Sequence, residues 1–254
     1  MLSLHDICDL PIQYDDFEDE VRIPIENICC QKRTINLSSM SPTLLNKSIS
    51  YPEKVYEEYS ISVDEKVEED KDLKYDILVL PSGLLGIEFI KSHVFYTPNV
   101  KEDEQLKFAT IVEGINGITT IIMQKNAFGI GSCRKPRVKE GVMMEIKPRE
   151  KVAIPSGYYY TFINTRDKCA VVSRVYKSYD LLDYKELKTK GLAYFCIRKN
   201  AKQELVYNPM FDHIPSIKKT TPEENHLPTL GFNLEESLYN LVKSNTEILL
   251  NILA

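Results

Sequence analysis

A cluster of basic side chains between residues 125 and 141 has the composition of a phosphate-binding loop. Within KNAFGIGSCRKPRVKEG the only acid is Glu140, so five positive charges against one negative charge give a local balance of +4, in a chain of net charge −5. The basic residues are Lys125, Arg134, Lys135, Arg137 and Lys139. Because arginine binds phosphate through two hydrogen bonds and stacks on bases, this segment predicts a contact with RNA.

Two glycines of the same segment, Gly129 and Gly131, favour this interpretation because they let the backbone approach another surface closely. Their spacing does not indicate a dinucleotide-binding motif, since no βαβ unit surrounds them and the third glycine is absent. The alternative is a solvated hairpin tip that keeps the protein soluble. We prefer the binding role, because the local charge opposes the charge of the whole chain.

Cysteine and histidine spacing predicts no zinc site. The six cysteines lie far apart except for one adjacent pair, and no C-x-x-C occurs. The N-terminal stretch has no basic and no apolar region of a secretory signal, and no run of 18 apolar residues is long enough to span a membrane. We therefore expect a reduced cytoplasmic protein that has neither a membrane nor DNA as a partner.

The elements that must position the basic loop are short strands. Each is rich in β-branched or aromatic residues, and turn sequences such as PSG, GING and NTRDK separate them. The predicted strands cover 77–80, 87–95, 108–114, 117–124, 141–146, 151–157, 159–164 and 169–176. Many short strands at near-regular spacing, with no long helix between them, predict a mainly β protein built on an antiparallel barrel or jelly roll.

Segments on both sides of this region lack its pattern, which predicts three parts. Residues 1–50 are expected to form an extended N-terminal arm and residues 51–209 the barrel with a few peripheral helices. Residues 210–254 are expected to form an irregular segment and an amphipathic helix, with a start resembling a capping box at Asn233 and Glu236.

Four segments between residues 55 and 209 carry a family resemblance: DILVLPSGLLGIEFIKSHVF, EGINGITTIIMQ, KVAIPSGYYYTFIN and DYKELKTKGLAYFCI. They are similar to the cupin-type phosphoglucose isomerases of archaea. The resemblance implies a cupin jelly-roll barrel. It also implies the isomerisation of glucose 6-phosphate to fructose 6-phosphate at a metal inside the barrel. The family's metal ligands are two histidines of a G-H-x-H strand, a glutamate and a later histidine.

Three of these four ligand positions are changed here. The G-H-x-H strand corresponds to Ser92-His93-Val94-Phe95, so His93 is kept and Phe95 replaces the second histidine. The glutamate position falls near Lys107 and the late histidine at Tyr160. A divalent metal needs imidazole or carboxylate ligands, usually three or more. We therefore expect a barrel without metal or other cofactor and without catalytic residues, in which His93 is a hydrogen-bonded histidine of the core or rim.

The losses fall in the expected active site, whereas the additional segments fall at the surface. This contrast predicts a non-catalytic cupin that has become a binding protein. A cupin-like body with such extensions also resembles the ribosome-bound dormancy factors of microsporidian spores. That resemblance implies a ribosome partner, contacted through ribosomal RNA and proteins. It also implies that the protein occupies a tRNA site, which we expect to be the exit site, and keeps idle ribosomes dormant.

Two alternatives stay open at this point. The first is a cupin isomerase acting on sugar phosphates, which needs a metal or a compensating base. The second is a metal-free sensor of sugar phosphates, which needs an open pocket that Phe95 and Tyr160 do not fill.

Overall fold

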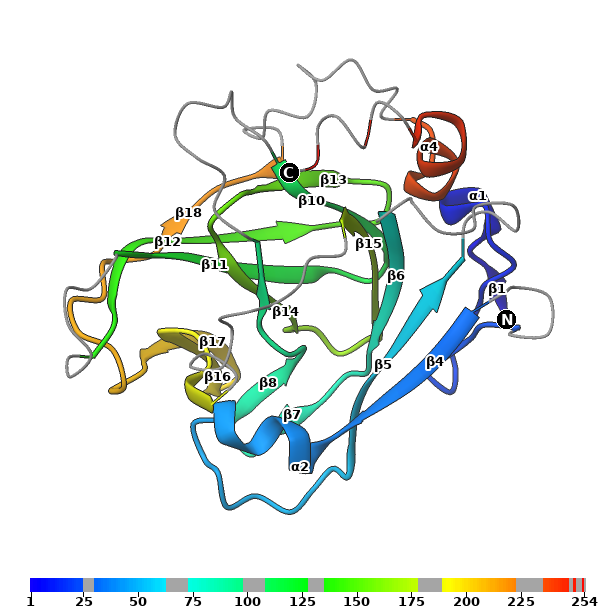
Figure 1. Ribbon diagram of the computed structural model, residues 1–254. Helices are drawn as coiled ribbons and strands as arrows, with labels where there is room; N and C mark the ends of the chain where they lie inside the picture. Colours follow the sequence, from blue (N-terminus) through cyan, green and yellow to red (C-terminus); the bar gives the residue numbers. More distant parts are fainter. Residues whose placement is uncertain are drawn as a thin grey trace.

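Two curved β-sheets face each other across a shared apolar core (Figure 1). The computed structural model describes residues 1–24, 30–62, 73–97, 108–127, 135–177, 189–222, 235–246, 249 and 253. Strands account for most of the secondary structure in these ranges. No helix among the described residues is long and apolar enough to cross a membrane.

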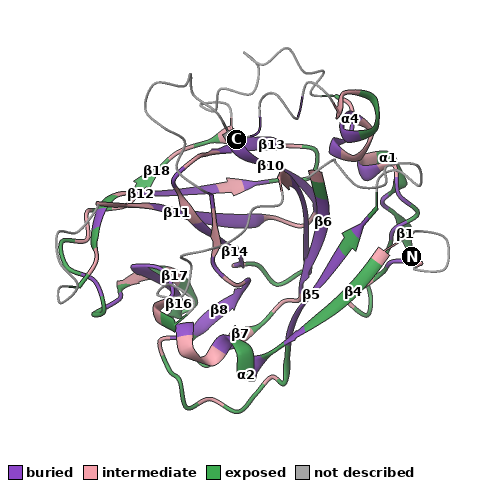
Figure 2. Ribbon diagram, viewed as in Figure 1, coloured by how far each residue is buried: buried purple, intermediate pink, exposed green. Residues whose placement is uncertain are grey.

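The first sheet has six antiparallel strands in the order β13-β10-β15-β6-β5-β4. Their bounds are β4 Cys30–Asn36, β5 Lys54–Ile61, β6 Leu73–Leu80, β10 Phe108–Asn116, β13 Lys151–Pro155 and β15 Ala170–Lys177. β4 lies at the edge and is mostly exposed, whereas β5 and β6 are mostly buried (Figure 2).

The second sheet has nine strands, and its main path runs β17-β16-β8-β14-β11-β12-β18, with β7 paired to β8 and β9 to β14. Its pairs are antiparallel, apart from the parallel pair of β12 and β18. The bounds are β7 Leu84–Leu85, β8 Glu88–Lys91, β9 Phe95–Tyr96, β11 Thr119–Ala127, β12 Arg137–Ile146, β14 Tyr159–Asn164, β16 Tyr194–Lys199, β17 Lys202–Tyr207 and β18 Lys218–Lys219.

Apolar side chains from both sheets fill the interior of the barrel. Leu78, Val112 and Val172 of the first sheet and Ile121 and Phe162 of the second are fully buried in one cluster. Successive side chains of a strand point to opposite faces, so each strand gives alternate residues to this core. The prediction of a mainly β fold built on an antiparallel jelly-roll barrel is confirmed. Each predicted range contains a strand, but the range 87–95 is divided between β8 and β9.

The outer face of the first sheet is covered by the beginning and the end of the chain (Figure 1). At the beginning, β1, β2 and β3 form a small antiparallel sheet next to helix α1. The bounds are β1 Leu2–Ser3, α1 His5–Cys8, β2 Gln13–Asp15 and β3 Glu20–Arg22. Ile12 of this segment packs with Ile77 and Val175 of the sheet.

Between these small strands and the barrel, the arm contributes an edge strand. β4 lies within residues 1–50 and extends the first sheet by pairing with β5. It is followed by α2 (Leu37–Met40) and a 3₁₀ turn (Ser41–Thr43). The arm is thus joined to the barrel through a strand, while the domain boundaries at residues 50 and 209 stay predictions.

The C-terminal helix starts later than the sequence suggests. Helix α4 spans Leu238–Ser244, and Ser237 is its N-cap, with a side chain that accepts a hydrogen bond from the Asn240 amide. Glu113 of β10 accepts from the Leu238 amide at 2.8 Å. The start is therefore set by the local Ser237 cap together with a contact with the sheet, and Asn233 of the expected start lies outside the described residues. The helix packs on its own barrel.

Candidate functional site

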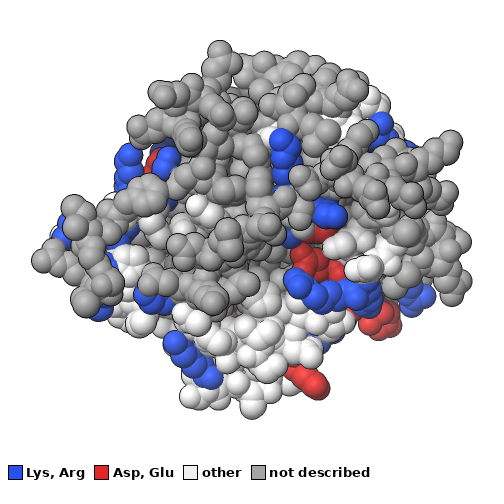
Figure 3. Space-filling model, viewed as in Figure 1, with Lys and Arg blue, Asp and Glu red and all other residues white. Residues whose placement is uncertain are grey.

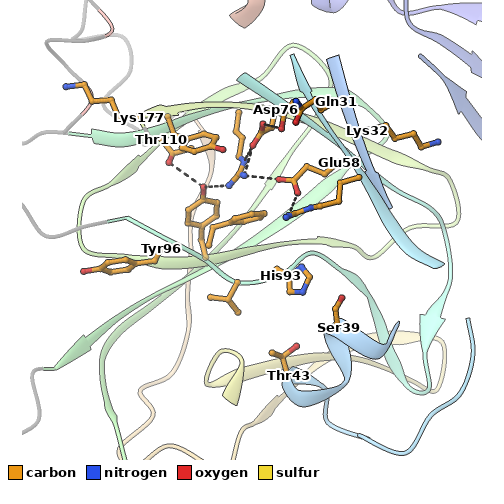
Figure 4. A pocket seen from close by; sticks show the side chains of 17 residues that line it. Gln31, Lys32, Ser39, Thr43, Glu58, Asp76, His93, Tyr96, Thr110 and Lys177 are labelled. Atoms are coloured by element: carbon orange, nitrogen blue, oxygen red, sulfur yellow. Dashed lines mark hydrogen bonds and ion pairs between the residues drawn. The ribbon is translucent and has the colours of Figure 1, made fainter. Parts of the chain in front are cut away.

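A cavity of about 750 Å³ opens between the two sheets (Figure 4). Strands β4, β5, β6, β10 and β15 of the first sheet line it, together with β9, β14 and the segment around His93. Phe95 and Tyr160 form part of its wall and leave it open. In Figure 3 acidic and basic side chains meet on the face where β4 and β5 lie.

The strand register places four charged residues in a row across the first sheet. Arg33 of β4 is directly opposite Glu58 of β5. Asp76 of β6 is directly opposite both Ser60 of β5 and Arg174 of β15. Glu58 and Ser60 are two residues apart and therefore share one face of β5. The row thus begins with a cation at the sheet edge, continues with two carboxylates and ends with a cation in the middle of the sheet.

Arg174 is the hub of this row. Its Nη2 atom lies 2.6 Å from Oδ2 of Asp76 and 3.0 Å from Oε1 of Glu58, and its Nε donates to the same Asp76 oxygen at 3.1 Å. Asp76 also accepts from the Ser60 hydroxyl at 2.8 Å. At the outer end, Nη2 of Arg33 lies 2.5 Å from Oε2 of Glu58. Each oxygen of Glu58 therefore contacts a different guanidinium.

Aromatic rings enclose the Arg174 guanidinium. Its Cζ atom lies 3.7 Å from the centroid of the Phe95 ring and 4.4 Å from that of Tyr176. Its Nη1 atom donates to the Tyr160 hydroxyl at 3.4 Å, and this hydroxyl donates to Thr110. The delocalised cation is suited to such contacts with ring faces.

Burial and charge act in opposite directions on Arg174. Burial lowers the pKa of the guanidinium, but Asp76 and other neighbours including Glu58 outweigh it, so this pKa lies well above its ordinary value. Burial also raises the pKa of the Tyr176 hydroxyl. The cavity therefore contains a charged guanidinium at its inner end, with the protonated phenol of Tyr176 beside it.

His93 is held by a buried tyrosine. The backbone amide of His93 donates to the Tyr56 hydroxyl at 3.3 Å, and the same hydroxyl lies 3.0 Å from Nδ1 of His93. Burial raises the pKa of Tyr56, so the phenol keeps its proton. The Tyr56 hydroxyl thus holds both the backbone and the ring of His93, and the tautomer of His93 decides which group donates in the contact with Nδ1.

These contacts do not fit the metal that the family resemblance implies. Phe95 has no donor atom, and Tyr160 is hydrogen-bonded to Arg174 and Thr110. His93 contacts the Tyr56 hydroxyl through Nδ1, and one imidazole alone does not make a metal site, which usually needs three or more protein ligands. Within the described ranges, no group of three or more His, Cys, Asp or Glu side chains could hold a metal ion. Lys107, near the expected glutamate position, lies outside those ranges.

The basic segment lies on the β11–β12 hairpin (Figure 1). Of its predicted contact residues, Gly129, Gly131 and Arg134 lie outside the described part of the chain, and four are described: Lys125, Lys135, Arg137 and Lys139.

Two of the four described cations have contacts within the protein. Nζ of Lys125 lies 5.7 Å from the ring centroid of Tyr158, and Nζ of Lys135 donates to the Pro209 carbonyl at 2.7 Å. Arg137 and Lys139 are exposed. The four residues share one hairpin, and their role in RNA binding stays a prediction.

Sequence reasoning missed the charged row, although the strands contain a signal for it. Asp76 interrupts the apolar run KYDILVL, and Arg174 interrupts VVSRVY. A charge inside an otherwise apolar strand is expected only when it has a partner. That signal identifies the two residues, but pairing them requires the register of strands almost a hundred positions apart.

Comparison of the sequence with known protein families identifies the family of this chain. The family model described as glucose-6-phosphate isomerase (GPI) matches residues 40–210, about two thirds of the chain. No curated protein sequence matches this chain. The matched range includes Glu58, Asp76 and Arg174, while Arg33 precedes it.

Solved cupin structures are similar at low sequence identity. The cupin domain of Drosophila melanogaster CENP-C is 12% identical, covering 48% of this chain and 69% of that one, with a TM-score of 0.30. The Schizosaccharomyces pombe Cnp3 cupin domain is 12% identical, covering 54% and 74%, with a TM-score of 0.31. The cupin-2 domain Rru_A2000 from Rhodospirillum rubrum is 9% identical, covering 63% and 74%, with a TM-score of 0.35.

The family match corrects one expectation from the sequence. Loss of the ligand positions at Phe95 and Tyr160 predicted a protein that is not an enzyme, but the matching family is one of isomerases. The expectation treated the metal as the only source of positive charge in the barrel. It overlooked Arg174, a buried cation that the chain itself supplies.

Proposed function

The chain belongs to the glucose-6-phosphate isomerase family, and from this we propose that it interconverts an aldose phosphate and a ketose phosphate in the barrel cavity. One observation carries the proposal. The buried guanidinium of Arg174 lies against Phe95 and Tyr160, two positions where the resemblance expects metal ligands, and beside the carboxylate of Glu58. A fixed cation and a base thus lie next to each other.

Such a pair matches what the isomerisation requires. In the open-chain aldose a base removes the proton from C2, the electron pair forms the C1–C2 double bond, and the carbonyl oxygen becomes an enediolate oxygen. A nearby cation stabilises this negative charge. The hydroxyl proton then moves from O2 to O1, and the base returns a proton to C1, which gives the ketose. No atom is gained or lost.

Glu58 is better placed than Asp76 for the base. Asp76 is 1% exposed and is held by Ser60 and by two nitrogens of Arg174. Glu58 shares one oxygen with Arg174, and its other oxygen faces Arg33 at the sheet edge. Asp76 therefore serves to orient Arg174, and Glu58 is the carboxylate that can exchange a partner for substrate.

The test is the interconversion of glucose 6-phosphate and fructose 6-phosphate by the purified chain, followed by ¹³C NMR in the presence of EDTA. Glu58→Gln is expected to lower kcat by about 10²–10⁴-fold, and Arg174→Lys by about 10²–10³-fold. Arg166→Lys is the matched control, because Arg166 pairs with Glu145 on the exposed surface at 2.8 Å. If the folded chain converts neither sugar phosphate, or if Glu58→Gln keeps its kcat, the proposal is wrong.

We propose ribosome binding as a second function, supported by the exposed cations Arg137 and Lys139 on the β11–β12 hairpin. The partner would be ribosomal RNA, with ribosomal proteins, in the cytoplasm, at a tRNA site that we expect to be the exit site. Phosphate contacts of this kind weaken as salt rises, since binding releases counterions.

Sedimentation through sucrose gradients tests this second function. The protein is expected to migrate with ribosomes at low salt and to dissociate at high salt. Replacement of Arg134, Lys135 and Arg137 by Glu is expected to abolish co-migration, whereas the same change at the exposed residues Lys47, Lys74 and Lys147 is not. Co-migration that survives the first triple replacement would rule out the hairpin as the contact.

A further inference from the structure

The Arg33–Glu58 ion pair joins an exposed side chain to a buried one. The Arg33 side chain is 67% exposed, whereas that of Glu58 is 6% exposed. Arg33 belongs to the edge strand β4, and Glu58 belongs to β5, one strand further into the sheet. Arg33 can therefore move into solvent while Glu58 stays in place.

Arg33 is one of two cations that contact Glu58. Its Oε1 atom lies 3.0 Å from Arg174, which is itself buried. A buried carboxylate that lost its sole partner would be strongly destabilised, but Glu58 would keep one guanidinium. Breaking the Arg33 contact therefore leaves a carboxylate that keeps its contact with Arg174 and has one oxygen available.

The cavity as a whole favours an anionic ligand. Four cations line it against two carboxylates, which gives +2 with histidine counted as neutral. The lining cations are Lys32, Arg33, Arg174 and Lys177. Arg174 is held by two carboxylates at the inner end. A phosphate group must therefore be bound by one of the other three lining cations.

Arg33 is the best placed of these three. Nζ of Lys32 lies 2.7 Å from Glu57, and in Figure 4 Lys32 points away from Glu58. Lys177 is at the end of β15 and in the same view also points away from the charged row. Only Arg33 among them is in contact with the row, through Oε2 of Glu58.

We propose that Arg33 recognises the phosphate group of the substrate and that its transfer from Glu58 to the phosphate makes the Glu58 carboxylate available to the sugar. This inference rests on the proposed isomerase function and names the residue that makes it specific for phosphorylated sugars. A phosphate with two negative charges competes well for a guanidinium held by a carboxylate with one, because arginine binds both groups through the same fork of N–H donors. A sugar without phosphate leaves Arg33 on Glu58.

Titration calorimetry with glucose 6-phosphate, glucose and inorganic phosphate tests the assignment. Wild-type protein is expected to prefer glucose 6-phosphate to glucose. Arg33→Gln is expected to weaken glucose 6-phosphate binding by about ten- to a hundredfold, because it removes one charge-assisted contact, and not to weaken glucose binding. Arg166→Gln, at an exposed ion pair, is the control and is expected to change neither.

Glu58→Gln provides a result of the opposite sign. It frees Arg33 from its carboxylate, so glucose 6-phosphate and inorganic phosphate are both expected to bind several-fold more tightly, while turnover is lost. The double variant Arg33→Gln/Glu58→Gln is expected to lose this gain. A gain that persists in the double variant would come from the removed negative charge alone and would overturn the role of Arg33.

The outcomes separate this inference from the proposed function. If wild-type protein binds and converts glucose 6-phosphate but Arg33→Gln has the same preference for the phosphorylated sugar, Arg33 is a structural ion-pair partner and the inference fails alone. If Arg33→Gln weakens glucose and glucose 6-phosphate equally, the inference fails in the same way. If wild-type protein binds no sugar phosphate, both proposals fail.

Discussion

The Cζ atom of Arg174 lies 3.7 Å from the ring centroid of Phe95, the residue that stands at the second histidine position of the metal site implied by the sequence resemblance. A phenylalanine cannot bind a metal ion, but its ring face attracts a guanidinium. The change from histidine to phenylalanine is therefore matched by a different cation. The positive charge in this barrel is covalently part of the chain and is set in place by the carboxylates of Asp76 and Glu58.

The first prediction concerns metal removal. Dialysis against EDTA is expected to leave both the thermal unfolding midpoint and the conversion of sugar phosphates unchanged, because Phe95 and Tyr160 give no ligand set around His93. Calorimetric titration of the EDTA-treated protein with Mn²⁺, Ni²⁺ or Zn²⁺ is expected to show no binding of one ion per chain. Stoichiometric binding that disappears in His93→Ala would show that a metal site exists around His93 and would contradict this prediction.

The second prediction compares two arginine–carboxylate pairs. Arg174→Met leaves Asp76 and Glu58 buried without their shared partner and is expected to cost about 3–5 kcal/mol of unfolding free energy. Arg166→Met breaks a pair with Glu145 whose side chains are 46% and 37% exposed, and it is expected to cost about 0–1 kcal/mol. Urea unfolding followed by circular dichroism measures both. Equal losses would show that Arg174 is not the centre of a buried network.

The third prediction concerns the tautomer of His93. In wild-type protein ¹⁵N NMR is expected to show one dominant tautomer of the His93 ring, because the Tyr56 hydroxyl contacts its Nδ1 atom. Tyr56→Phe removes the hydroxyl that contacts both Nδ1 and the backbone amide of His93. Loss of that acceptor is expected to cost about 1–3 kcal/mol and to change the tautomer ratio. A spectrum that is the same in Tyr56→Phe would mean that another contact fixes the ring.

The fourth prediction concerns alkaline pH. Burial raises the pKa values of Cys8, Cys169 and Cys196 from the ordinary 9.0 to about 12. The pKa of each thiol is thus higher in the folded state than in the unfolded state. Below pH 9 the thiols are protonated in both states and the fold keeps its full stability. As pH rises from 9 towards 12, the unfolded state loses these protons first, and stability is lost. The unfolding free energy is therefore expected to fall over that range.

Thiol labelling checks the same burial at single residues. At pH 8 iodoacetamide is expected to modify Cys30, which is partly exposed, faster than the three buried cysteines, because thiolates are the reactive form. Mass spectrometry of peptides distinguishes the four sites. Fast labelling of Cys169 in folded protein would contradict its position in the core.

The strands and their order of appearance were predictable because they depend on local patterns. The apolar runs at 77–80 and 169–176, and the turns at PSG and GING, place β6 and β15, although β6 begins at Leu73, before the predicted range. The start of α4 was misplaced at Asn233, since the cap is Ser237, whose side chain accepts from the Asn240 amide. A tertiary contact adds to this local cap, because Leu238 is held by Glu113, 125 residues earlier.

Of the candidate site, only some residues of the cavity wall could be predicted from the sequence. His93, Phe95 and Tyr160 do line the cavity, as the resemblance implies. Arg33 was missed because it belongs to an arm that shows no barrel pattern, and its partner Glu58 lies 25 residues further along the chain. Whether a charged residue of a strand points into a cavity depends on the register, and the register is set by pairings that single residues do not reveal.

Two neighbouring residues of β4 contact two neighbouring residues of β5. Lys32 contacts Glu57, and Arg33 contacts Glu58. A ligand that bridges Arg33 and Arg174 would tie this edge strand to the middle of the sheet. By reciprocity, such a ligand stabilises the attachment of β4 by the same free energy by which an attached β4 improves its binding. Hydrogen exchange at the β4 amides would thus report on the occupancy of the cavity.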